Sequence, residues 1–149
     1  MDDKANGSQP GGVFTGDTLF IAGCGRFFEG TGDEMNRALS YLGTLPNDTV
    51  LYNGHEYTAG NLAFAKSIDR DNKALDKLTD LMNHNSITTG LTTIGDEKEW
   101  NVFMRLESEP VQLVIEIRTS LASTFLPMFT IAKLHLRLQR HRKVILWIL

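Results

Sequence analysis

Between residues 13 and 84 the sequence alternates short apolar runs with segments of helical periodicity. Residues 13–15 and 18–22 are β-branched and aromatic and are separated by Gly16-Asp17, which predicts two strands flanking a tight corner. A third buried strand is predicted at 50–52. Such alternation predicts an α/β layer architecture. The expected helices span 33–42, 58–68 and 71–82 and begin at Asp33, Thr58 and Asp71.

The charge divides the chain into two unlike regions. Residues 1–109 hold nine Lys and Arg against 17 Asp and Glu, a net charge of −8, whereas residues 110–149 hold six against one, a net charge of +5. The length of 149 residues suits one domain, and the single Cys excludes a disulfide-stapled scaffold or a Cys-rich zinc module. The first 12 residues are polar and acidic, unlike a signal peptide.

The basic region from residue 110 onward has no clear structural pattern. Residues 111–118 could form a strand or a helix, and residues 144–149 form a bare apolar end. Its longest uncharged run, 119–132, is 14 residues long and contains Pro127, so it is shorter than the roughly 20 apolar residues of a membrane span. The region could bind a membrane surface or an anionic partner, but its charged and apolar residues do not separate onto faces, which favours a terminal extension without function.

Polar residues follow two of the predicted strands. Asp17 comes after the first strand, and His55 follows the strand at 50–52. In open α/β sheets such residues line the ligand crevice, and a carboxylate and an imidazole there could share Zn²⁺, Mn²⁺ or Fe²⁺. The spacing alone leaves the alternative open that Asp17 forms a turn and His55 is a hydrogen-bonded surface residue.

Four segments together resemble the hydroxyacylglutathione hydrolase (glyoxalase II) family of the metallo-β-lactamase superfamily. They are Phe-Thr-Gly-Asp-Thr-Leu-Phe at 14–20, Ala-Gly-Cys-Gly-Arg-Phe-Phe-Glu-Gly at 22–30, Gly-His-Glu-Tyr at 54–57 and Asn-Val-Phe-Met-Arg at 101–105. The resemblance implies the C-terminal half of an αββα sandwich followed by a small helical domain. The expected divisions are a polar lead-in at 1–12, a partial metallo-β-lactamase-like domain at 13–57, a helical substrate-binding domain at 58–109 and an atypical tail at 110–149.

The resemblance also implies a site and a reaction. The family hydrolyses S-D-lactoylglutathione to D-lactate and glutathione on two metal ions, which we expect to be zinc, with iron or manganese as alternatives. We expect a small-molecule substrate, no nucleic acid, no transmembrane span, a monomer and a cytoplasmic location, or a mitochondrial one. The matching residues are Asp17 and His55 for the metals, and Arg26, Phe28, Tyr57 and Arg105 for the glutathione portion.

Each of these substrate residues also has a simpler interpretation. Arg26 could be a solvated loop charge, the Phe27-Phe28 pair could be core aromatics, and Tyr57 could pack under the helix that follows it. Arg105 could pair with one of three nearby acids. Those acids are Asp96, Glu97 and Glu99. Cys24, between two glycines and without a base nearby in sequence, is expected to be a loop residue and not a nucleophile.

The chain also departs from the family. The motif Thr-His-x-His-x-Asp-His is absent, and of seven expected ligands only Asp17 and His55 remain. A catalytic zinc usually takes three protein ligands, so we expect this chain to be the C-terminal part of such an enzyme, with its own activity lost. The alternative function is a non-catalytic remnant that binds glutathione conjugates.

Overall fold

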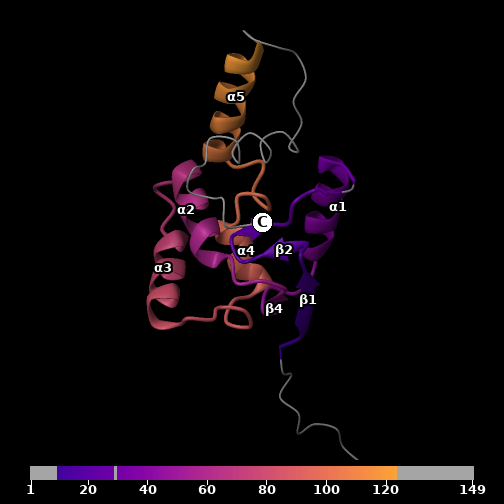
Figure 1. Ribbon diagram of the computed structural model, residues 1–149, viewed down its shortest axis with the longest axis vertical. Coiled ribbons are helices and arrows are strands. Elements are labelled where there is room, and N and C mark those ends of the chain that lie inside the picture. The colour runs from indigo at the N-terminus through magenta and orange to yellow at the C-terminus, as the bar shows by residue number, and fades with distance from the viewer. Residues whose placement is uncertain (1–9, 29, 124–149) are drawn as a thin grey trace, which may run out of the picture.

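The computed structural model describes residues 10–28 and 30–123, which form a mixed α/β structure (Figure 1). Residues 124–149, which make up most of the predicted tail, lie outside the described residues. The hypothesis that the tail binds a membrane surface rests mainly on these residues. The elements in chain order are β1 (Gly12–Gly16), β2 (Leu19–Phe20), β3 (Gly23–Cys24), α1 (Gly32–Leu42), β4 (Val50–Asn53), α2 (Thr58–Ile68), α3 (Ala74–His84), α4 (Ile94–Trp100) and α5 (Glu109–Ser123).

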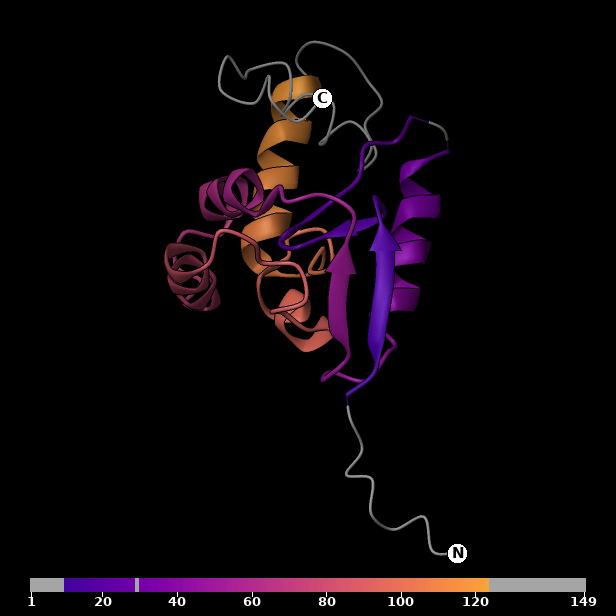
Figure 2. The same cartoon turned by 60° about the horizontal axis from the view of Figure 1, so that its bottom comes forward.

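The centre of the fold is the parallel pair of β1 and β4. Val13 faces Leu51 across the pair, and an irregularity follows Phe14 so that Gly16 faces Asn53. Parallel strands need a crossover connection, and α1 supplies it. Figure 2 shows the two strands side by side, with α1 on one side and α2 and α3 on the other. The ends of β1 and β4 therefore point the same way, which brings the residues that follow them to one edge.

The second predicted strand, 18–22, is wrong as a single strand. The chain turns back at Ile21-Ala22, so that β2 and β3 form a short antiparallel hairpin. Ala22 has φ of 55°, a backbone conformation that residues other than glycine rarely adopt. Its N–H donates to the Glu97 carboxylate at 2.9 Å, and the Asn101 side chain donates to the carbonyl of Gly23 at 3.0 Å. Contacts from a distant helix thus determine the turn.

The three predicted helices are present, and α2 has the predicted range, but none of them has the predicted residue as its cap. The cap of α1 is Thr31, not Asp33, because the Thr31 hydroxyl and the Glu34 carboxylate form a reciprocal capping box. At α2 the cap position is Tyr57, since the hydroxyl of Thr58 is turned toward Glu56 and Thr88. At α3 the helix starts at Ala74, three residues after the predicted start, and the Asn72 side chain accepts the Ala74 N–H.

Two further helices complete the described chain. The helix α4, which no sequence pattern had predicted, begins with a second capping box between Thr93 and Asp96. Residues 111–118, for which strand and helix were both open, lie within α5. None of the helices among the described residues is long and apolar enough to cross a membrane.

The hydrophobic core joins the strands to the helices and includes Leu39 of α1 as well as residues of the helices that follow β4. Its largest fully buried side chain is Trp100 of α4, and Leu51 of β4 is also fully buried. Leu19 and Ile21 of the hairpin region and Leu75 and Leu78 of α3 are buried in the same cluster. Segments far apart in the sequence therefore share one core, and the site residues lie along its rim.

Candidate functional site

Asp17 and His55 meet at the edge where β1 and β4 end. His55 Nδ1 lies 2.7 Å from Asp17 Oδ1. Both side chains are largely exposed, at 52% for His55 and 65% for Asp17. Because β1 and β4 are parallel, the residues after them reach the same edge although they are 38 positions apart in the sequence. The structure therefore brings together the two residues that the sequence placed at strand ends.

Two glycines let the backbone approach Asp17 closely. A Cβ atom on Gly54 would lie 2.7 Å from Asp17 Oδ1, and one on Gly25 would lie 1.8 Å from the Asp17 carbonyl oxygen. The Gly54 N–H also donates to the Gly16 carbonyl at 2.8 Å. Neither position has room for a side chain, so the backbone around Asp17 is fixed from two sides.

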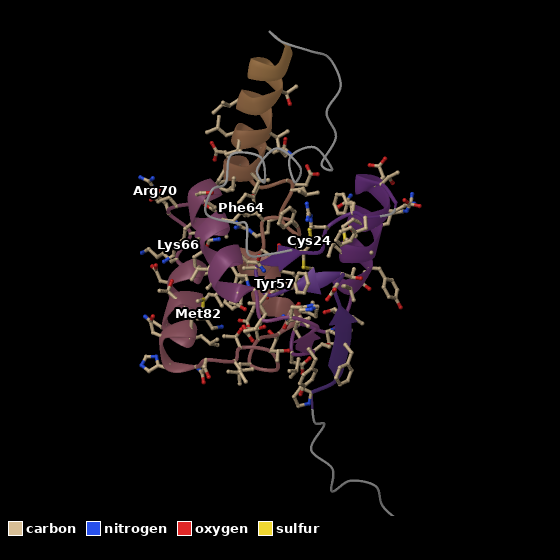
Figure 3. The ribbon with its side chains drawn as sticks, viewed as in Figure 1. Cys24, Tyr57, Phe64, Lys66, Arg70 and Met82 are labelled. Atoms are coloured by element: carbon tan, nitrogen blue, oxygen red, sulfur yellow. The ribbon has the colours of Figure 1, made fainter. Side chains whose placement is uncertain are left out.

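Tyr57 and Phe20 form the aromatic wall beside His55. The Tyr57 ring stacks on the imidazole of His55, with centroids 5.1 Å apart and planes at 6°. Phe20 meets Tyr57 edge-on at 5.1 Å and His55 at 6.2 Å. In Figure 3 Tyr57 lies toward the centre of the molecule, whereas Lys66 and Arg70 extend outward on the α2 side. Tyr57 thus contacts His55 directly, beyond any packing against the helix that follows.

Arg26 and Phe28 lie together on the loop after β3. The Arg26 guanidinium carbon is 5.6 Å from the centre of the Phe28 ring, within the range of a cation–π contact. Phe28 is 83% exposed, so the interpretation of Phe28 as a core aromatic is wrong, whereas Phe27 does pack against the core. An exposed aromatic ring with an arginine over it is available to a ligand.

Arg105 forms an ion pair, but with none of the three acids expected from the sequence. Its Nη1 donates to Asp69 Oδ2 at 2.6 Å, across 36 positions of sequence, and the Asp69 side chain is buried. Of the expected acids, Asp96 is bonded to Lys77 and to its own helix cap. The pair joins the end of α2 to the segment before α5. Since a guanidinium has five N–H donors, this contact leaves Arg105 further donors for a ligand.

Cys24 lies in β3 and not in a loop as predicted, and it is buried, in accordance with a structural role. Burial raises the pKa of its thiol to about 12, so the reactive thiolate is essentially absent at neutral pH. Nucleophilic catalysis by this residue is therefore disfavoured. His84 hydrogen-bonds the Asp80 carbonyl at an exposed position.

Sequence reasoning missed a group of buried polar residues behind the site. Glu97 is fully buried and accepts N–H donors from Ala22, Trp100 and Asn101, each at 2.9 Å. Burial raises the pKa of Glu97 to about 7, although those three donors oppose the shift. The same Asn101 also donates to the carbonyl of Phe20 at 3.3 Å. This cluster holds the β2–β3 turn, which carries Phe20 of the aromatic wall.

The donors that meet at Asp17 and His55 suit part of a metal site. Two ligand atoms at about 2.0–2.1 Å from one tetrahedral zinc ion lie about 3.3 Å apart, so the two side chains, now 2.7 Å apart in a hydrogen bond, would have to separate slightly to hold an ion. Among the described residues, however, no three His, Cys, Asp or Glu side chains come together as a ligand group. The described residues therefore offer two ligands at this edge, whereas a catalytic zinc usually takes three protein ligands.

Comparison with known proteins identifies the family. Residues 56–134 match the family model described as the hydroxyacylglutathione hydrolase C-terminus. That match covers more than half of the chain, and it continues past residue 109, where the sequence suggested that a tail begins. The chain belongs to the hydroxyacylglutathione hydrolase family, a family of hydrolases.

Curated relatives agree with this assignment. A probable hydroxyacylglutathione hydrolase of Schizosaccharomyces pombe is 48% identical over 126 residues, which cover 77% of this chain and 49% of that protein. In Saccharomyces cerevisiae the cytoplasmic isozyme is 50% identical and the mitochondrial enzyme 47% identical. The alignments cover 67% and 69% of this chain and 40% of each relative. The chain thus spans about half the length, or less, of the curated relatives that it matches.

Proposed function

We propose that this chain forms one side of the site of a glyoxalase II-type thioester hydrolase acting on S-D-lactoylglutathione. The observation that carries the proposal is the meeting of Asp17 and His55 at 2.7 Å with Tyr57 stacked on the imidazole. A carboxylate can bridge two metal ions and an imidazole can hold one of them, so the residue types suit a hydrolytic centre. Zinc is the proposed metal, with iron and manganese as alternatives.

Two of the proposed substrate-binding residues carry the positive charge that suits the carboxylates of glutathione. Glutathione carries two carboxylates, and arginine binds carboxylates better than lysine because its fork can donate two parallel hydrogen bonds. Arg26 beside Phe28, and Arg105 beside Asp69, are the proposed binding residues, together with Tyr57. The ion pair to the buried Asp69 would then hold Arg105 in place while its remaining donors face the ligand.

The proposed fold and location follow the family. The parallel β1–α1–β4 unit is compatible with one half of an αββα sandwich, with α1 as one of its outer helices. A cytoplasmic location is proposed, with the mitochondrion as the alternative, because the relatives include one isozyme of each kind.

Binding of S-D-lactoylglutathione without hydrolysis is the expected behaviour of this chain alone. Titration followed by NMR should give saturable shifts at Tyr57 and Arg26, and Tyr57→Ala should weaken binding about fivefold or more, because removing a stacked aromatic removes about 1 kcal/mol or more. With Zn²⁺ added, release of glutathione, followed with a thiol reagent, should stay at the blank rate, because two ligands do not hold a catalytic ion.

The matched control is Tyr41→Ala, which removes an exposed tyrosine of α1 remote from the aromatic wall. It should leave the affinity unchanged. Absence of saturable binding, or equal losses in the two tyrosine variants, would overturn the proposed binding site. Zinc-dependent release of glutathione that Asp17→Asn abolishes would instead show that the chain completes a catalytic centre by itself.

A further inference from the structure

A polar cluster ties the loop that carries His55 and Tyr57 to a distant segment of the chain. The Glu56 carboxylate lies between these two residues in sequence and accepts the Thr88 N–H at 2.8 Å and the Thr58 hydroxyl at 2.8 Å. It also accepts the hydroxyl of Thr88 and, more weakly, the N–H of Thr89 at 3.4 Å. Four donors on one carboxylate give it a fixed orientation.

The two threonines of this cluster are buried, whereas Glu56 itself is exposed. Thr58 and Thr88 are each only 2% exposed, and their hydroxyls are 2.7 Å apart. Although Glu56 is exposed, its carboxylate is hydrogen-bonded to these two buried threonines. The cluster therefore fixes the loop and is more than a surface charge.

The start of the same loop is tied to the same segment. Asn53 N–H donates to the Thr89 hydroxyl at 3.1 Å, and the Asn53 side chain donates to the His55 carbonyl at 2.5 Å. Residues 53 and 56 are thus both anchored on Thr88-Thr89, and His55 lies between the two anchors. The ring of His55 is half exposed, so packing alone does not hold it against Asp17.

We propose that Glu56, through Thr88, is a positioning residue that holds His55 against Asp17 and in stack with Tyr57. The inference rests on the proposed function, since it assigns Glu56 a part in building that site. The hydrogen bonds of the Glu56 carboxylate are made with three threonines and not with Asp17 or the imidazole. The effect of Glu56 is exerted through the backbone of residues 55–57, which its carboxylate connects to Thr88. Without that connection, the imidazole would lose its fixed orientation toward Asp17.

The test measures the position of the imidazole directly. A tyrosine stacked on the imidazole changes the NMR chemical shifts of the His55 ring protons, and this shift change disappears when the stack opens. At one fixed pH, the Glu56→Gln and Thr88→Val variants should lose most of that chemical-shift change. Glu56→Gln removes acceptor capacity from the cluster, and Thr88→Val removes a hydroxyl donor. Thr88→Ser keeps the hydroxyl and should restore the chemical-shift change. The dissociation constant for S-D-lactoylglutathione should rise several-fold in Thr88→Val and return in Thr88→Ser.

Controls separate positioning from general destabilisation. Glu99→Gln changes an exposed glutamate of α4 and should leave the His55 signals unchanged. If Glu56→Gln does not fold, the Thr88→Val and Thr88→Ser pair decides the question. If the His55 ring protons of folded Glu56→Gln or Thr88→Val kept the chemical shifts of the wild-type chain, the positioning role would be overturned. Failure of the wild-type chain to bind the thioester would instead contradict the proposed function. The chemical shifts of the His55 ring protons would still decide whether Glu56 positions the imidazole.

Discussion

Replacing Glu97 by alanine is expected to lower the free energy of unfolding by about 3 kcal/mol or more. The substitution leaves two buried donors without an acceptor, the Ala22 N–H and the Trp100 indole N–H. The Asn101 side-chain amide also loses one acceptor but keeps the carbonyls of Phe20 and Gly23. Each unsatisfied buried donor costs about 1–3 kcal/mol. Ala22 would also lose the contact that holds it at φ of 55°. Denaturant unfolding of the variant measures the loss.

The control for this substitution lies on the same helix. Glu99→Ala removes an exposed carboxylate two residues away and should change the unfolding free energy by no more than about 0.5 kcal/mol. Equal effects of the two substitutions would contradict the assignment of Glu97 as the acceptor that organises the β2–β3 turn.

The burial of Glu97 should also make the free energy of unfolding depend on pH. The folded state raises the pKa of Glu97 to about 7, mainly because the side chain is fully buried, so folding favours its protonated form. The stability contributed by this group is therefore fully present below its ordinary pKa and is lost as the pH rises through about 7. Between pH 5 and 8 the unfolding free energy should fall by roughly 2 to 3 kcal/mol, and Glu97→Gln should remove that fall.

The window from pH 5 to 8 isolates Glu97 from the other shifted carboxylates. Hydrogen bonds lower the pKa of Glu34 and Glu56, although burial opposes the shift at Glu56. Their contributions to stability are present above their ordinary pKa and are lost only as the pH falls further. A stability that rises with pH across the window, or one whose pH dependence is the same in Glu97→Gln, would contradict the burial of this acid.

Gly25→Ala is expected to have a comparably large effect at the site itself. The new Cβ would lie 1.8 Å from the carbonyl oxygen of Asp17, and a backbone atom cannot move aside as a flexible side chain can. We expect a loss of about 3 kcal/mol or more in unfolding free energy, with displacement of Asp17 from His55 in whatever folded fraction remains. Thermal unfolding and the NMR signals of His55 measure the two effects.

Gly11→Ala provides the matched control. A Cβ there would have no heavy atom within 4 Å, so the substitution should be tolerated. If Gly25→Ala were as stable as Gly11→Ala, the close approach of Gly25 to the Asp17 carbonyl would be wrong.

Local patterns in the sequence predicted the parts of the fold that depend on local forces. The strand at 50–52 and the helices α1, α2 and α3 follow from periodicity within a short window. Their starting residues were less predictable, because several side chains compete for each cap. At α1 the Thr31 and Glu34 pair has the capping-box spacing, so the correct cap was present in the sequence beside Asp33.

The residues behind the site depend on contacts that no local pattern contains. A glutamate is normally exposed, and the buried position of Glu97 depends in part on the N–H of Ala22, which lies 75 positions away in the sequence. Arg105 finds Asp69 rather than a neighbouring acid for the same reason, since the fold brings the end of α2 beside it. The Asp17 and His55 pair was predictable because parallel strands carry their following residues to one edge.

The meeting of Asp17 and His55 as a ligand pair is tested most directly by titrating the chain with Mn²⁺ and following line broadening by NMR. Paramagnetic broadening detects weak binding, as expected for two ligands, and manganese accepts both carboxylate and imidazole. The signals of Asp17, His55 and Gly54 should broaden first, and Asp17→Asn should abolish this preference while Asp48→Asn leaves it intact. Broadening spread evenly over exposed carboxylates, or persisting unchanged in Asp17→Asn, would contradict a ligand pair at this edge.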